Sequence, residues 1–133
     1  MNNPGNYSLA SIGIATALSS SAQTAITDLE GISSVTLEAV FAYGSGGSTC
    51  SIIVQTTLDD GQTWRDVARF DFATSSAVKH ANLSANSSKA VTSYSVLSGE
   101  GVYDAVLGNS LRAVISSSGT YANTTVSLKA AVR

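Results

Sequence analysis

Alternating apolar and polar positions mark the clearest predicted strand, residues 34–43. Its odd-numbered positions fall on one face of an extended chain and are apolar or aromatic: Val35, Leu37, Ala39, Phe41 and Tyr43. A repeat of two residues is typical of a strand with one buried face. We therefore expect this segment to contribute one face to the core.

Two further predicted strands flank a turn. Residues 49–58 alternate with Cys50 on the same parity as Ile52 and Val54, so we expect the thiol to be buried. Asp59, Asp60 and Gly61 then form an Asp-Gly turn signal, and residues 62–72 form the returning strand. The alternation is imperfect in this second strand, and a β-bulge near Asp66 repairs it.

The remaining chain reads as short strands between Gly, Ser and Asn turns. Residues 1–7 predict a flexible polar arm, and an edge strand is expected within 8–18. Further strands are predicted at 77–83, 89–97, 102–107, 110–116 and 121–132. Eight or nine short strands favour an all-β fold, a single antiparallel β-sandwich over residues 8–133. Both jelly-roll and immunoglobulin-like topologies fit this spacing.

Composition narrows the function classes. The 133 residues suffice for one domain, and Ser and Thr together exceed a quarter of them, whereas charged residues make up only 12%. A net charge of −2 predicts no nucleic-acid partner, and no apolar run is long enough for a membrane helix. The first residues also lack the pattern of a signal peptide. With one Cys and one His, we expect no metal site and no cofactor.

One motif is sharp. Residues 57–64 read Thr-Leu-Asp-Asp-Gly-Gln-Thr-Trp, which resembles the Asp-box hairpin of sialidases and other β-proteins. Asp59 is suited to accept hydrogen bonds from turn N–H groups, and Gly61 to adopt a positive φ. Thr63 returns the chain to a strand, and Trp64 covers the hairpin. We interpret these four residues as hairpin-shaping, because the Asp-box is a scaffold element and one copy cannot build a propeller.

Residues 51–72, SIIVQTTLDDGQTWRDVARFDF, resemble small β-sandwich proteins of tailed-bacteriophage virions. The resemblance implies a non-enzymatic capsid decoration (cement) protein that is assembled into the virion in the host cytoplasm. It also implies the major capsid protein, or another virion protein, as partner, and a homo-oligomer for which a trimer is one expectation. A position on the tail or fibre is the alternative.

The expected partner contacts are polar, aromatic or cationic residues, and Arg is enriched at protein interfaces. They are Asn2, Asn3, Tyr7, Arg65, Arg69, Arg112 and Arg133.

Other functions remain as alternatives. A carbohydrate-binding module would use exposed tyrosines, although separate packing of each tyrosine is favoured. A small hydrolase would need Asp66, Asp71 or His80 around one site. Asp59 and Asp60 have the chemistry for Ca²⁺, but turn capping explains them better.

Overall fold

A computed structural model describes residues 4–133 and confirms the all-β class: this part of the chain contains strands and no helix. The strands are β1 (Gly5–Ile14), β2 (Ser21–Ala22), β3 (Ser34–Ala42), β4 (Ser45–Gly46), β5 (Thr49–Thr57), β6 (Arg65–Phe72), β7 (Ala77–Ser84), β8 (Gly101–Val102), β9 (Ser110–Ser118), β10 (Tyr121–Ala122) and β11 (Thr124–Val132).

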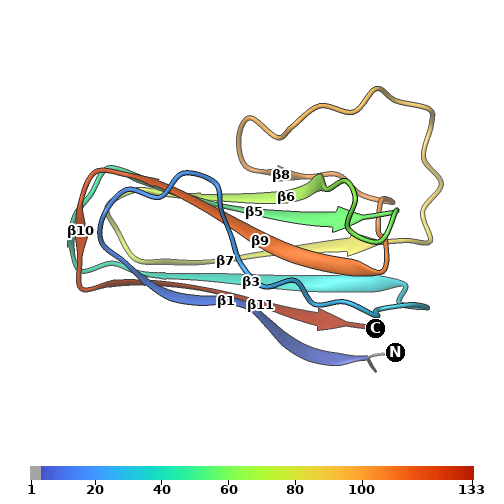
Figure 1. Cartoon of the computed structure of the whole chain (residues 1–133), viewed down its shortest axis with the longest axis horizontal. Coiled ribbons are helices and arrows are strands. Elements are labelled where there is room, and N and C mark those ends of the chain that lie inside the picture. The colour runs from blue at the N-terminus through green and yellow to red at the C-terminus, as the bar shows by residue number, and fades with distance from the viewer. Residues whose placement is uncertain (1–3) are drawn as a thin grey trace.

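The strands form antiparallel sheets arranged in two layers (Figure 1). The first sheet has the order β1-β11-β3-β7, and the second has the order β2-β9-β5-β6-β8. The short strands β4 and β10 form a two-stranded ribbon at one end of the molecule. Apart from the β5–β6 pair, neighbouring strands in both large sheets are distant in sequence, so non-local pairing dominates this fold.

The core lies between the two large sheets. The odd-numbered face of β3 points inward as predicted, with Val35, Leu37 and Ala39 fully buried. Phe41 stacks on Phe72 of the opposite sheet with ring centroids 5.0 Å apart, and these two rings join the layers. Apolar side chains from both faces thus remove each other from water, which is the main stabilising term for two packed sheets.

The predicted β5–β6 hairpin and its bulge are confirmed. Val54 pairs with Ala68 and Gln55 pairs with Asp66, so Val67 is the extra residue in β6. The insertion allows Val67 and Ala68 both to be buried while Asp66 and Arg69 lie on the outer side of the sheet. The bulge therefore positions the first residues of β6 for the site described below.

The strand prediction for residues 89–97 is wrong, and that for 102–107 is mostly wrong. Residues 85–100 form an irregular segment, hereafter the strap, and only Gly101–Val102 pairs with β6. Neither face of 89–97 was consistently apolar, because Val91 and Leu97 share their parity with two serines. A strand with no apolar face gains little from joining a layer, so the chain leaves the sheet here and Val91 is fully exposed.

The N-terminal prediction also needs correction. Strand β1 begins at Gly5, where it pairs with Val132, so Gly5 to Tyr7 belong to the sheet rather than to an arm. Backbone pairing with the last strand outweighs the turn preferences of Gly5 and Asn6. Asn2 and Asn3 lie outside the described residues.

Candidate functional site

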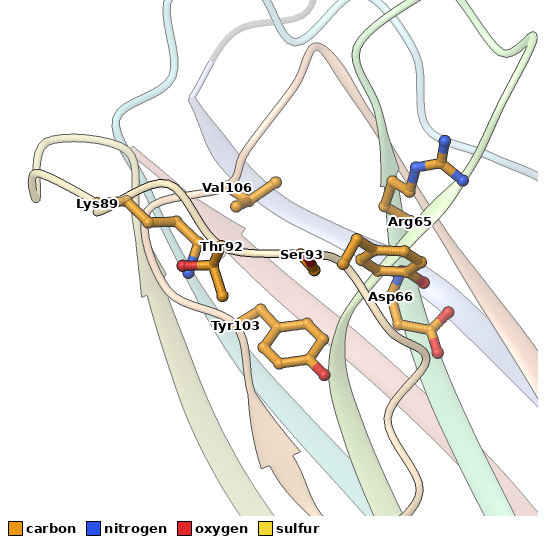
Figure 2. A pocket seen from close by; sticks show the side chains of 8 residues that line it. Arg65, Asp66, Lys89, Thr92, Ser93, Tyr103 and Val106 are labelled. Carbon is orange, nitrogen blue, oxygen red and sulfur yellow. The ribbon is translucent and has the colours of Figure 1, made fainter.

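A pocket opens between the strap and the start of β6 (Figure 2). Its volume is about 160 Å³, the space of a small group rather than of an extended ligand. Side chains from the strap, from β6 and from the segment after β8 line it: Arg65, Asp66, Lys89, Thr92, Ser93, Tyr94, Tyr103 and Val106.

Two tyrosines form the aromatic wall of this pocket. The rings of Tyr94 and Tyr103 meet edge to face, with centroids 6.2 Å apart. The Tyr94 hydroxyl accepts a hydrogen bond of 2.9 Å from the Asp66 backbone N–H, and the Tyr103 hydroxyl lies 3.3 Å from Ser95 Oγ. The wall is therefore fixed by polar contacts at the rim, and the ring faces supply apolar surface.

Asp66 is the only buried carboxylate among residues 4–133, and its oxygens are occupied. Oδ1 accepts a hydrogen bond of 2.9 Å from Gln55 Nε2, and Oδ2 accepts one of 3.1 Å from the Leu97 backbone N–H. Gln55 Oε1 in turn accepts a bond of 2.8 Å from Arg112 Nε. Asp66 consequently holds the strap on the sheet, and both of its oxygens are committed to that task.

Further contacts tie the strap to β6. Arg69 donates to Asp71 and to the Leu97 carbonyl, both at 2.8 Å. Glu100 accepts bonds from Lys79 and from the Asp71 backbone N–H. Hydrogen bonding to Lys79 is the main reason that the pKa of Glu100 is lowered.

The Asp-box residues shape the turn next to the pocket. Asp59 Oδ1 accepts from the Thr63 N–H at 2.8 Å, and Oδ2 accepts from the Thr63 hydroxyl at 2.7 Å. These two bonds are the largest causes of a lowered pKa at Asp59. Gly61 has a φ of 91°, where a side chain is disfavoured. Trp64 lies 4.4 Å from the guanidinium of Arg112, so the hairpin also orients that cation.

Two of the four predicted arginine contacts, Arg69 and Arg112, lie on the outer face of the second sheet, and a third, Arg65, is the first residue of β6 and lines the pocket. Arg65 stacks on Tyr94 at 5.1 Å, whereas Arg69 and Arg112 are held by Asp71 and Gln55. Arg133 is instead at the end of β11, where its backbone pairs with Ser34. Tyr7 lies in β1 and packs against the core from the opposite sheet.

The residues weighed for hydrolysis do not converge. His80 is in β7, where its Nε2 lies 3.0 Å from Glu38 Oε2 on the exposed face of the first sheet. Asp66 and Asp71 are on β6 in the second sheet. Within residues 4–133, no three His, Cys, Asp or Glu side chains are grouped so as to hold a metal ion.

Sequence reasoning missed the pairing of Tyr94 with Tyr103. The signal lay in the turn at Gly99-Glu100-Gly101, which returns the chain and brings residues on both sides of it together. Two further tyrosines, Tyr43 and Tyr121, pack instead with Phe41.

Comparisons with known proteins add no relative: no protein family, no curated protein and no solved structure matches this chain. No helix that could cross a membrane occurs in the part of the chain that the structure describes.

Proposed function

We propose that this chain is a structural, non-enzymatic protein of a tailed-phage virion, which decorates the capsid shell and stabilises it through protein–protein contacts. The observation that carries the proposal is the exposed apolar surface of the strap. Among residues 4–133, six large hydrophobic side chains are exposed, and four of them lie in the strap or directly after it: Val91, Tyr94, Val96 and Val102. Exposed apolar side chains concentrated in one segment of the chain favour a protein-binding role for that segment.

Its surroundings support the same interpretation. Lys89 lies in the strap and Arg65 stacks on its Tyr94, and neither forms a direct ion pair within the described residues, although the charge of Lys89 contributes to the lowered pKa of Asp104. Arg69 and Lys79, by contrast, each contact a carboxylate. Apolar groups bordered by unpaired cations suit a protein surface that is apolar and acidic at its rim. The resemblance of residues 51–72 supports the major capsid protein, or another virion protein, as this partner.

We further propose a jelly-roll sandwich rather than an immunoglobulin-like one. Eight strands wind in nested antiparallel pairs, in which the first pairs with the last and the pairing proceeds inward: β1 with β11, β2 with β9, β3 with β7, and β5 with β6. Nested pairing divided between two layers is the arrangement of a rolled-up double Greek key. This topology supports the virion interpretation without identifying the partner.

The carbohydrate-binding alternative rests on the Tyr94–Tyr103 wall, and Thr92 and Ser93 line the same pocket. Such an aromatic wall next to polar groups is suited to a single sugar ring. A glycan array tests it: specific binding that Tyr103→Ala abolishes favours this alternative, which would place the chain at a tail or fibre.

Binding to capsid shells tests the leading proposal. Shells of the major capsid protein that lack this chain are mixed with wild type, with V91S/V96S or with V78S, and bound protein is measured by co-sedimentation. Val78 is the matched control, because it is also exposed but lies on β7 of the other sheet. We expect V91S/V96S to weaken binding roughly tenfold, as about 1.4 kcal/mol of lost apolar burial would.

Equal binding of all three variants would exclude the strap as the contact. The proposal as a whole fails if a map of the intact particle shows this chain on the tail or lacks it altogether.

A further inference from the structure

Strand β1 forms an edge of the first sheet, and apart from the β-bulge between Ser8 and Ala10 it has none of the usual protections against pairing. Over its ten residues, Gly5–Ile14, it contains no charged side chain and no proline. Figure 1 shows it along the border of its layer. A long uncharged edge presents unpaired N–H and C=O groups and is a template for another strand.

The other edges of the two large sheets are blunted. Strand β7 has Lys79 and His80 near its middle. The strands β2 and β8, which border the second sheet, have two residues each. Charged side chains and very short strands are the usual means by which an edge avoids association. Of these four edge strands, β1 is therefore the one that is both long and uncharged.

The register shows which backbone groups of β1 face outward. Arg133, which directly follows β11, exchanges both backbone hydrogen bonds with Ser34, the first residue of β3. Bonded residues alternate along an antiparallel strand, so the even-numbered residues of β11 bond to β1. Their partners after the β1 bulge are Ala10, Ile12 and Ile14. The N–H and C=O groups of Ser11 and Gly13 therefore point to the open side.

A groove runs beside this open edge. Its volume is about 290 Å³, and its lining comes from β1 and from the segment after β2: Ser8, Leu9, Ala10, Ser11, Ile12, Gln23, Thr24 and Ile26. A strand added to β1 would direct its inward side chains toward the apolar part of this groove, which Ile12 and Ile26 provide.

We propose that β1 pairs antiparallel with β1 of a second copy of this chain, about a two-fold axis at Ile12. Ser11 of each copy then faces Gly13 of the other and exchanges two backbone hydrogen bonds with it. Ile12 lies opposite its own counterpart. The β-bulge between Ser8 and Ala10 confines the pairing to residues 10–14.

A second copy fits this edge for three reasons. Two uncharged edges meet without repulsion, the outward side chain of Ser11 is small, and Gly13 has none. A strand that pairs with its own copy about a two-fold axis also forms a closed dimer, because both copies use the same surface. The two Ile12 side chains cover each other over the groove. The inference does not depend on the virion role, and it predicts a dimer where the sequence resemblance implied a trimer.

Oligomeric state is the first test. The wild-type chain should sediment as a dimer at about 100 µM, because interfaces of this small kind have micromolar or weaker affinity. Ser11→Pro removes an outward N–H without removing a bond to β11, and edge strands tolerate proline there. It should be a monomer with an unchanged far-UV spectrum, and Ser11→Ala, which keeps the N–H, should remain a dimer.

Cross-linking is the second test and is independent of the proline variant. Cα atoms of a narrow antiparallel pair are about 4.5 Å apart, within disulfide range. Ile12→Cys should therefore form a covalent dimer on mild oxidation, whereas Val78→Cys should not, and the native Cys50 is buried. A wild-type monomer or trimer, or equal cross-linking of both variants, overturns the proposal. A dimer with no binding to capsid shells overturns only the virion role.

Discussion

Asp66 and Leu97 join the second sheet to the strap: Asp66 Oδ2 accepts a hydrogen bond of 3.1 Å from the Leu97 backbone N–H, 31 residues further along the chain. The same carboxylate accepts a bond from Gln55, so it connects two strands and a segment without regular structure. A buried acceptor with two donors cannot lose one without cost, because the donor left behind stays desolvated.

Asp66→Asn should loosen the strap and destabilise the fold. The amide has one acceptor oxygen, so its NH₂ group must face either Gln55 Nε2 or the Leu97 N–H, both of which are donors. We expect a loss of about 1–3 kcal/mol in the free energy of unfolding, measured by urea titration. Hydrogen exchange should accelerate at Leu97. Asp28→Asn, at an exposed position with a φ of 58°, is the control and should change little.

The Asp-box turn should be sensitive to acid. The pKa of Asp59 is lowered in the folded chain, chiefly by its bonds to Thr63. Its stabilising contribution is therefore present above the unfolded value near pH 4, and it is lost as the pH falls through the folded pKa. The drop in urea midpoint from pH 7 to pH 3 should be smaller for Asp59→Asn than for wild type. An equal drop in both would show that the turn contributes nothing to acid sensitivity.

Gly108 should not tolerate a side chain. A Cβ built at this position would collide with the backbone oxygen of Thr57, so the strand end or the loop must move. Gly108→Ala should cost about 1–3 kcal/mol or more in thermal or urea unfolding, as overpacking does. Gly99→Ala is the matched control: no atom lies within 4 Å of its added Cβ, and a change within about 0.5 kcal/mol is expected.

The Cys50 thiol should be inert in the folded chain. The prediction that it is buried is confirmed, since it is 1% exposed, and desolvation raises its pKa to about 11. Little thiolate is then present at pH 8, and access is blocked. Labelling by a thiol reagent should be slow in buffer and rapid in urea. Fast labelling of the native chain would show that β5 opens locally.

Local sequence patterns predicted the regular strands, because a strand with one buried face alternates apolar and polar side chains with a period of two residues. Residues 34–43 have an apolar odd parity, and β3 buries that face. The bulge near Asp66 was predictable for the same reason, since an interrupted alternation needs one extra residue to resume. Residues 89–97 had β-branched and aromatic residues but no apolar face, and propensity alone did not make a strand.

The site depended on contacts that no local pattern contains. Tyr94 and Tyr103 form one wall only because Asp66 and Arg69 hold the intervening chain against β6. Likewise, β1 pairs with β11 from the other end of the chain, which extends the first strand to Gly5. These pairings follow from closing two apolar layers over each other, and the energy of that closure is shared among residues far apart in sequence.

Alternation and turn chemistry alone were sufficient for the all-β class, the β5–β6 hairpin and the inward face of β3, because each depends on neighbours within a few residues. The order of the strands, the exposed apolar strap and the open edge at β1 emerged only from the packed layers. Which strand ends at an edge, and which segment has no layer to join, is decided by competition among all strands for the same buried surface.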